Sequence, residues 1–121
     1  MSALFLPKQV DLLETLADFT GQLKCGVRLK LKADEIPEGW AEGIGLPVRG
    51  YIELNGPWPF REVEWLEINP IVIEYIGRVV KPRQHNHLEN ILLHLKSRGI
   101  NHSVDEGMIR IPFSEFRAQY S

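Results

Sequence analysis

Strict alternation of apolar and polar residues over positions 23–32 is the feature that most constrains this chain. Five apolar residues occupy the odd positions: Leu23, Cys25, Val27, Leu29 and Leu31. Four of the five even positions are Lys or Arg. Successive side chains of a strand point to opposite faces, so this period predicts a strand with one face on a core and a basic face in water.

Two segments have the spacing of amphipathic helices. Residues 8–20 form the first, with Pro7 suited to a first helical turn and Gly21 to the position just past the end. Residues 86–98 form the second, and Gly99 supplies its stop. The apolar stripe of the second helix is Leu88, Ile91, Leu92 and Leu95.

Between these helices the sequence predicts a loop and three further strands, of which the third follows the Asn69-Pro70 turn. Residues 33–46, rich in Gly and in acidic residues, are expected to form a long loop. Strands are predicted at 47–54 and 60–68, separated by a proline-rich turn at 55–59, because proline cannot donate to a ladder. The apolar phase of 60–68 changes near Trp65 and Leu66, which predicts a β-bulge there.

The last predicted elements follow the Asn69-Pro70 turn. Residues 71–80 are β-rich on both faces, which favours a strand that is central in the sheet or covered on both sides. Residues 100–104 and 108–112 flank a turn and predict a small hairpin. Ser114 is a candidate N-cap for a short helix ending at Tyr120.

These elements predict one α+β domain over residues 1–121. The predicted order is α-β-β-β-β-α-β-β-α, with a mostly antiparallel sheet of four to six strands and the helices packed on one face. The 121 residues are enough to bury a core without a disulfide or a metal. The single cysteine and the lack of a long apolar run indicate a cytoplasmic protein.

Charge is unevenly distributed, although the net charge is only −2. Residues 33–77 hold nine acidic residues against two basic ones, whereas 78–98 hold five basic residues against one acidic one. One interpretation is that oppositely charged strand faces compensate each other across the sheet. The other is that the acidic stretch binds a basic protein, since complementary potentials speed and select partners.

The second interpretation gives the candidate binding residues. They combine acidic side chains with tryptophans, which are enriched in binding hot spots. The set is Asp34, Glu35, Glu38, Trp40, Glu42, Trp58, Glu62, Glu64 and Glu67.

Motifs for catalysis, metals or cofactors are not evident. Cys25 lies on the apolar face of the 23–32 strand and is expected to behave as a small buried hydrophobe. His85, His87 and His94 do not have the spacing of a strong zinc pattern. We therefore expect no catalytic residue, no metal and no cofactor.

The favoured hypothesis is a small protein-binding module, one form of which is an inhibitor of the bacterial immunity-protein or antitoxin type. It would neutralise a basic toxin or enzyme by covering it with the acidic surface. One alternative is an enzyme with a dispersed active site. Another, less favoured, is a nucleic-acid binder that uses the basic segment 78–98.

Overall fold

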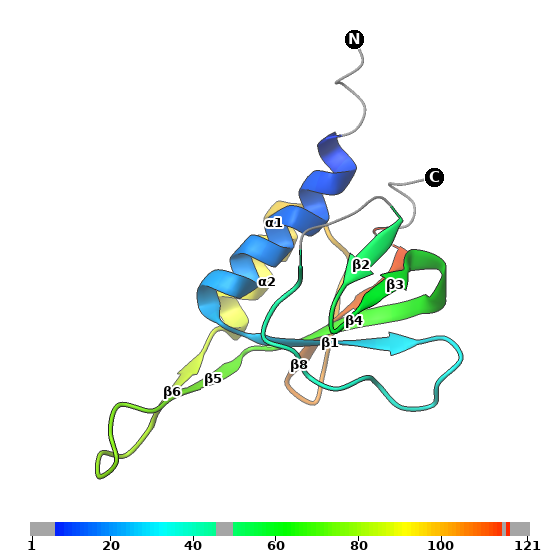
Figure 1. The fold of residues 1–121 in the computed structure, drawn as a ribbon. Helices are drawn as coiled ribbons and strands as arrows, with labels where there is room; N and C mark the ends of the chain where they lie inside the picture. Colours follow the sequence, from blue (N-terminus) through cyan, green and yellow to red (C-terminus); the bar gives the residue numbers. More distant parts are fainter. Residues whose placement is uncertain (1–6, 46–49, 115, 117–121) are drawn as a thin grey trace.

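The fold is α+β, and Figure 1 shows the order of its elements. The computed structural model describes residues 7–45, 50–114 and 116. This part of the chain has two α-helices, α1 (Pro7–Leu23) and α2 (Leu88–Ser97), and a short 3-10 helix, η2 (Phe60–Glu62). The strands are β1 (Gly26–Leu31), β2 (Tyr51–Glu53), β3 (Pro57–Pro59), β4 (Val63–Asn69), β5 (Ile71–Glu74), β6 (Arg83–Asn86), β7 (Ser103–Asp105) and β8 (Met108–Pro112).

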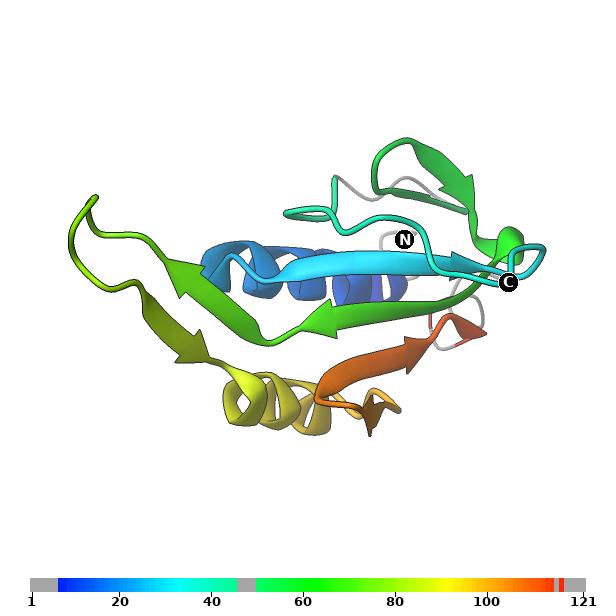
Figure 2. The same ribbon diagram turned by 90° about the horizontal axis from the view of Figure 1, so that it is seen from below.

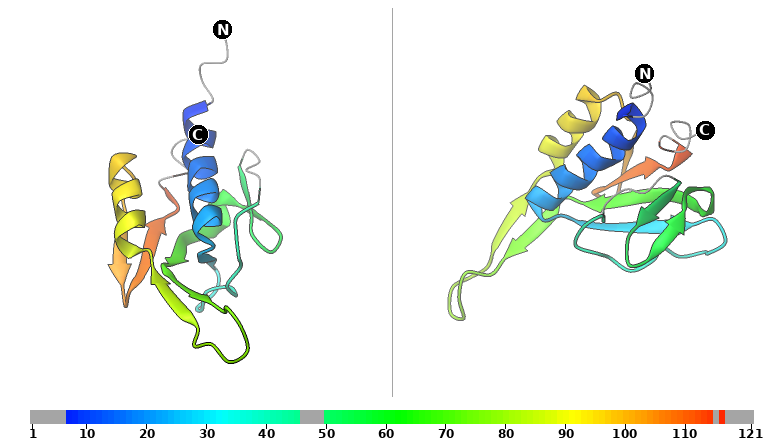
Figure 3. Two further views of the ribbon diagram at one scale, coloured as in Figure 1. Left: turned by 90° about the vertical axis from the view of Figure 1, so that its left-hand side faces the viewer. Right: turned by 45° about the horizontal axis from the view of Figure 1, so that its top comes forward.

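The main sheet is antiparallel throughout and has the strand order β1-β4-β8-β7. Two smaller two-stranded sheets, β2-β3 and β5-β6, complete the strand pairing. The helices lie side by side over one face of the main sheet (Figures 2 and 3). The predicted mostly antiparallel sheet with helices on one face is therefore confirmed.

Rows of apolar residues that run across the strands build the core. Leu29 of β1 pairs with Leu66 of β4, which pairs in turn with Ile111 of β8. The next row is Val27, Ile68 and Ile109. All six side chains are fully buried. The period-two pattern of β1 thus faces a core that the helices close.

A bulge in β4 adjusts the phase of this core. The β1–β4 register passes from Lys30 opposite Trp65 to Leu31 opposite Val63, which leaves Glu64 as the extra residue. Because of that extra residue, Val63 and Leu66 both face the core. The bulge predicted near Trp65 and Leu66 is confirmed.

The ends of both helices are Schellman motifs, but only one is at the predicted place. Gly99, at φ 66°, ends α2, and its neighbour Ile100 is buried, as expected. In contrast, α1 continues through Gly21 to Leu23, and Lys24 at φ 60° takes the left-handed position. The amides of Lys24 and Cys25 bond to the carbonyls of Gly21 and Thr20, which fits this motif. The predicted strand 23–32 therefore begins later, at Gly26.

Four other predictions need correction. The strand expected over 60–68 begins at Val63, after a short 3-10 helix at Phe60–Glu62. Residues 55–59 are not only a turn, because Pro57–Pro59 pairs with Tyr51–Glu53, as proline can in a ribbon with a free edge. The strand expected over 47–54 is described only over Tyr51–Glu53, and 46–49 lie outside the described residues. The strand predicted over 71–80 ends at Glu74.

The C-terminal hairpin is confirmed. Strands β7 and β8 pair across a turn in which Glu106 and Gly107 have φ values of 52° and 81°. Positive φ at both central residues is the type I′ pattern that matches the twist of a hairpin. Most of the helix predicted from Ser114 to Tyr120 lies outside the described residues. None of the described helices has the length and apolarity to span a membrane.

An aromatic contact joins the two helices. The rings of Phe19 (α1) and His94 (α2) stack with centroids 4.2 Å apart and planes 5° apart. His94 Nε2 is buried, and no hydrogen-bond partner for it lies among the described residues. Burial, and secondarily the charge of Arg98, lower the pKa of His94 below its usual value. His94 is therefore a packing residue whose burial favours the neutral imidazole.

We predict a large loss of stability for Leu66→Ala, because this change leaves a cavity in the central row of the core. The free energy of unfolding should fall by about 2–5 kcal/mol in urea denaturation. The matched control is Leu93→Ala on the exposed side of α2, which should change it by less than about 0.5 kcal/mol. Equal losses in the two variants would contradict the assignment of the core.

We also predict a pH dependence that comes from His94. Its pKa is lowered by folding, so the unfolded chain binds the proton more readily. The stability of the wild type should therefore fall as the pH drops below about 6.5, the ordinary value. His94→Leu should flatten this slope in urea denaturation at a series of pH values, whereas His102→Asn should retain it. An unchanged slope in His94→Leu would be inconsistent with this role.

Candidate functional site

A two-stranded arm projects from the main sheet where β4 ends. We call residues 71–86 the arm; it consists of β5, β6 and the segment 75–82 between them. The strands pair in antiparallel register from Ile71 opposite Asn86 to Glu74 opposite Arg83. Figure 1 shows the arm extending away from both the sheet and the helices.

Local hydrogen bonds fix the root of the arm. Asn69 Oδ1 accepts from the amide of Ile71 at 3.0 Å, which turns the chain around the buried Pro70. The amide of His87 donates to the carbonyl of Pro70 at 2.9 Å. Asn86 Oδ1 accepts from the amide of Leu88 at 3.0 Å, at the start of α2. The arm is therefore attached on one side to β4 and on the other to α2.

The surface of the arm is unusually apolar for an exposed segment. Val79 is 96 % exposed and Tyr75 is 78 % exposed. Ile73, Ile76 and Val80 are also exposed. Several large apolar side chains exposed within one short segment indicate an interaction surface, whereas single exposed ones are normal. The basic residues among them are Arg78, Lys81 and Arg83, all exposed.

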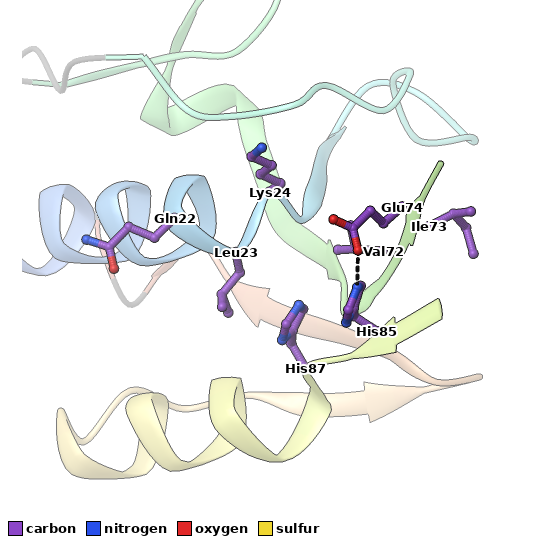
Figure 4. A pocket seen from close by; sticks show the side chains of 8 residues that line it. All are labelled: Gln22, Leu23, Lys24, Val72, Ile73, Glu74, His85 and His87. Carbon is purple, nitrogen blue, oxygen red and sulfur yellow. Dashed lines mark hydrogen bonds and ion pairs between the residues drawn. The ribbon is translucent and has the colours of Figure 1, made fainter. Parts of the chain in front are cut away.

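A pocket of about 340 Å³ lies between the arm and the C-terminal end of α1. Figure 4 shows Glu74 and His85 facing each other across the two arm strands, with His87 beside them. His85 Nε2 lies 3.0 Å from Glu74 Oε1, and the rings of His85 and His87 stack 6.1 Å apart. The hydrogen bond from His85 is the main cause that lowers the pKa of Glu74. The remaining lining residues are Gln22, Leu23, Lys24, Val72 and Ile73.

The outer face of the main sheet carries a compensated charge network. Glu67 is only 2 % exposed, and its carboxylate bonds to Arg28 of β1 and, at 3.1 Å, to Arg110 of β8. Each arginine also packs on a tryptophan ring. Arg28 Cζ lies 4.3 Å from the ring centroid of Trp40, and Arg110 Cζ lies 4.2 Å from that of Trp65. Both distances suit a cation–π interaction. The carboxylate of Glu67 is therefore paired with arginines of the two neighbouring strands and does not form part of an open acidic surface.

The other strand acids and Trp58 have different surroundings. Glu64 lies 2.7 Å from Lys30 Nζ and stays half-exposed. Glu62 is exposed. Trp58 is partly buried against the core and donates from Nε1 to the carbonyl of Leu54 at 3.1 Å. Compensation between neighbouring strand faces, the first interpretation of the charge map, therefore applies to Glu64 and Glu67.

The acidic loop, which follows β1 and is described as far as residue 45, runs back along the outer edge of β1. The amide of Glu38 donates to the carbonyl of Leu29 at 2.7 Å, and Ala41 forms a bridge with Val27. The acidic side chains of this loop are partly or fully exposed; they are Asp34, Glu35, Glu38 and Glu42. Of the nine candidate binding residues, the structure leaves five exposed, which are Glu35, Trp40, Glu42, Glu62 and Glu64, whereas Asp34 and Glu38 are partly buried.

Two further sequence expectations concern metal and thiol chemistry. Cys25 is fully buried and burial raises the pKa of its thiol, so the expected buried hydrophobe is confirmed. Among the described residues, no group of three or more His, Cys, Asp or Glu side chains could hold a metal ion.

The arm is the feature that sequence reasoning missed. The apolar residues of 71–80 suggested a covered strand, but Val79 and Val80 lie beyond its end, in solvent. One signal was present: Gly77 and Pro82 interrupt the run, and three basic residues fall between positions 78 and 83. A covered strand would not carry charges at that density.

Residues 41–112 match a family of unknown function, DUF6678. The matched range spans more than half of the chain. The chain belongs to this family. The DUF6678 range includes the whole arm and the strands that carry Glu67 and Arg110. No curated protein and no solved structure matched the chain.

We predict that Glu67→Gln destabilises the fold, because it leaves Arg28 and Arg110 beside a buried neutral group. The free energy of unfolding should fall by about 1–3 kcal/mol. Glu64→Gln breaks an exposed pair and should cost less than about 1 kcal/mol. Chemical denaturation of both variants at pH 7 tests this, and a loss for Glu64→Gln as large as that for Glu67→Gln would refute it.

Proposed function

We propose that this chain is a small protein-binding module that contacts its partner mainly through the arm. One observation carries the proposal: five apolar side chains of the arm are exposed within eight residues, from Ile73 to Val80. At roughly 25 cal/mol per Å² of apolar surface removed from water, covering them would supply a substantial binding free energy. A partner that buries this surface is the simplest physical reason for its composition.

Unpaired backbone groups offer the partner a second kind of contact. The arm is a two-stranded sheet, so in the described residues each of its strands pairs only with the other. Their outer edges therefore present free amides and carbonyls to an added strand. Strand addition combines such backbone bonds with pockets for alternate side chains. The arm supplies both kinds of contact on an element with a fixed root.

A narrower form of the proposal concerns the acidic surface. The exposed acids Glu35, Glu42 and Glu62 support binding of a basic partner, such as a toxin or an enzyme that the module neutralises by covering it. Glu67 would contribute indirectly, by holding Arg28 and Arg110 in place. We propose a cytoplasmic location for this activity, since the chain has a single cysteine.

The nucleic-acid alternative rests on the same arm. Arg78, Lys81 and Arg83 would contact phosphates, and apolar residues on a β-ribbon can act as wedges between bases. The body of the chain outside the arm is acidic, which opposes binding to a polyanion. For the enzyme alternative, Glu74 and His85 form the pair nearest a pocket, but both side chains are about half exposed. A protein partner fits the arm better than either alternative.

The test is quantitative capture from native cells with an arm variant, Ile76→Ser/Val79→Ser. We expect the variant to lose a partner that the wild type captures, with the affinity for the identified protein at least about tenfold weaker. The control is Leu93→Ser, which also replaces an exposed apolar side chain with serine, but on α2 instead of the arm. Both variants should match the wild type in urea denaturation.

Three outcomes discriminate the candidates. Loss of a protein partner in the arm variant alone supports the proposal. Equal capture by the wild type and the arm variant contradicts it. Capture that disappears after nuclease treatment and weakens steeply with salt indicates the nucleic-acid alternative.

A further inference from the structure

The two ends of the main sheet carry complementary surfaces. The arm leaves the sheet after Asn69, at the end where β4 pairs with Gly26 of β1. The opposite end, where Leu31 pairs with Val63, carries the turn into the acidic loop. We call residues 34–38 of this turn the acidic apex. Figure 2 shows the arm and the apex at opposite ends of the molecule.

We propose that the partner of the arm is the acidic apex of a second copy of this chain. This inference rests on the proposed function, because it takes the arm to be the binding element and names what covers it. Charge, apolar exposure and geometry each support a second copy as the occupant.

Charge complementarity is the first support. The arm carries Arg78, Lys81 and Arg83 against Glu74. The apex carries Asp34, Glu35 and Glu38 and no basic residue. The neighbourhood of the apex also contains Lys32, Arg61 and Glu62, since the amide of Lys32 donates to the carbonyl of Glu62. Including these three, four acidic residues stand against two basic ones, so the region remains opposite in sign to the arm.

Apolar exposure is the second support. Ile36, in the middle of the apex, is 73 % exposed. It lies between acidic residues, as Val79 and Val80 of the arm lie between basic ones. An interface that places apolar side chains at its centre and charges at its rim is the usual arrangement between proteins.

The apex is also held in place before binding. The amide of Asp34 donates to the carbonyl of Leu31 at 3.2 Å, and that of Glu38 donates to the carbonyl of Leu29 at 2.7 Å. These bonds anchor both sides of the turn to β1. A surface that is already ordered loses less conformational entropy when a partner docks.

Geometry favours contact between copies over contact within one copy. The six residues of β1 span roughly 17 Å, and the arm and apex point away from its two ends. Two copies placed antiparallel would bring each arm to the other's apex. The two contacts are then equivalent, so the assembly closes as a two-fold dimer. Pairing of arm with arm would instead oppose like charges.

Charge reversal at each surface tests the proposal. The arm variant is Arg78→Glu/Lys81→Glu and the apex variant is Glu35→Lys/Glu38→Lys. Sedimentation equilibrium over a range of protein concentrations gives the dimer dissociation constant of each. We expect the wild type to dimerise, and each variant alone to have a dissociation constant at least about tenfold higher. Added salt should weaken the wild-type dimer, because the exposed charges are screened.

Complementation between the variants is the decisive measurement. An equimolar mixture of the arm and apex variants restores both opposite-sign contacts, so dimers should reappear. A chain with all four substitutions should also dimerise. The control is Glu89→Lys/Lys96→Glu on exposed positions of α2, which should leave the wild-type constant unchanged. Far-ultraviolet circular dichroism and urea denaturation establish that every variant is folded.

A wild type that stays monomeric up to millimolar concentration would overturn the inference. So would an apex variant that dimerises as well as the wild type, because the arm would then bind elsewhere on the second copy. If the wild type is monomeric and the arm variant Ile76→Ser/Val79→Ser still loses a captured partner, the proposed function stands and a different protein covers the arm.

Discussion

Strand β4 is the element on which the other parts of the molecule depend. It pairs with β1 on one side and with β8 on the other, so its central residues, from Trp65 to Ile68, each have two cross-strand neighbours. Its inward residues Leu66 and Ile68 form the centre of the core, and its outward residue Glu67 holds two arginines. Beyond Asn69 the same chain direction continues into the arm. A change in the register of β4 would therefore move the core, the charge network and the arm together.

The extra residue at Glu64 allows β4 to contribute both to the core and to the charge network on the outer face. Without it, the side chains before and after the bulge could not both keep their present faces, because a shift of one residue inverts the pattern of a strand. With it, Val63 faces the core at one end of β4, and Trp65 covers Arg110 on the outer face. The outer face becomes a layer in which opposite charges are neighbours. Exposed charges of opposite sign lie at the two ends of the sheet, on the acidic apex and on the arm.

Elements with a regular period could be predicted well from sequence. The alternation around Leu29, the helical stripe that contains Ile91, and the change of phase near Trp65 all correspond to structure. Each of these signals depends on burial of one face, which local sequence records directly. The ends of the elements were predicted less well: Lys24 takes the left-handed position just past α1 that Gly21 was expected to take. There the hydrogen bonds of the motif outweigh the local preference for glycine.

The acidic candidates show a different limit. Sequence showed that Glu64 and Glu67 are outward strand residues, but not which strand lies beside them. Pairing with β1 places them next to Lys30 and Arg28 and so removes much of the negative potential that their spacing suggested. Cross-strand neighbours of this kind are set by the sheet order, which is a non-local property.

The sequence by itself determined the α+β class, the core-facing residues of β1 and the hairpin at the C-terminal end, because each follows from short-range periodicity or turn chemistry. Only the tertiary structure decided that the apolar run after Pro70 leaves the sheet as an exposed arm. Composition shows that Val79 and Val80 favour a strand, but not whether anything covers them. Burial depends on what packs against a segment, and in this chain the helices cover the main sheet and leave the arm in solvent.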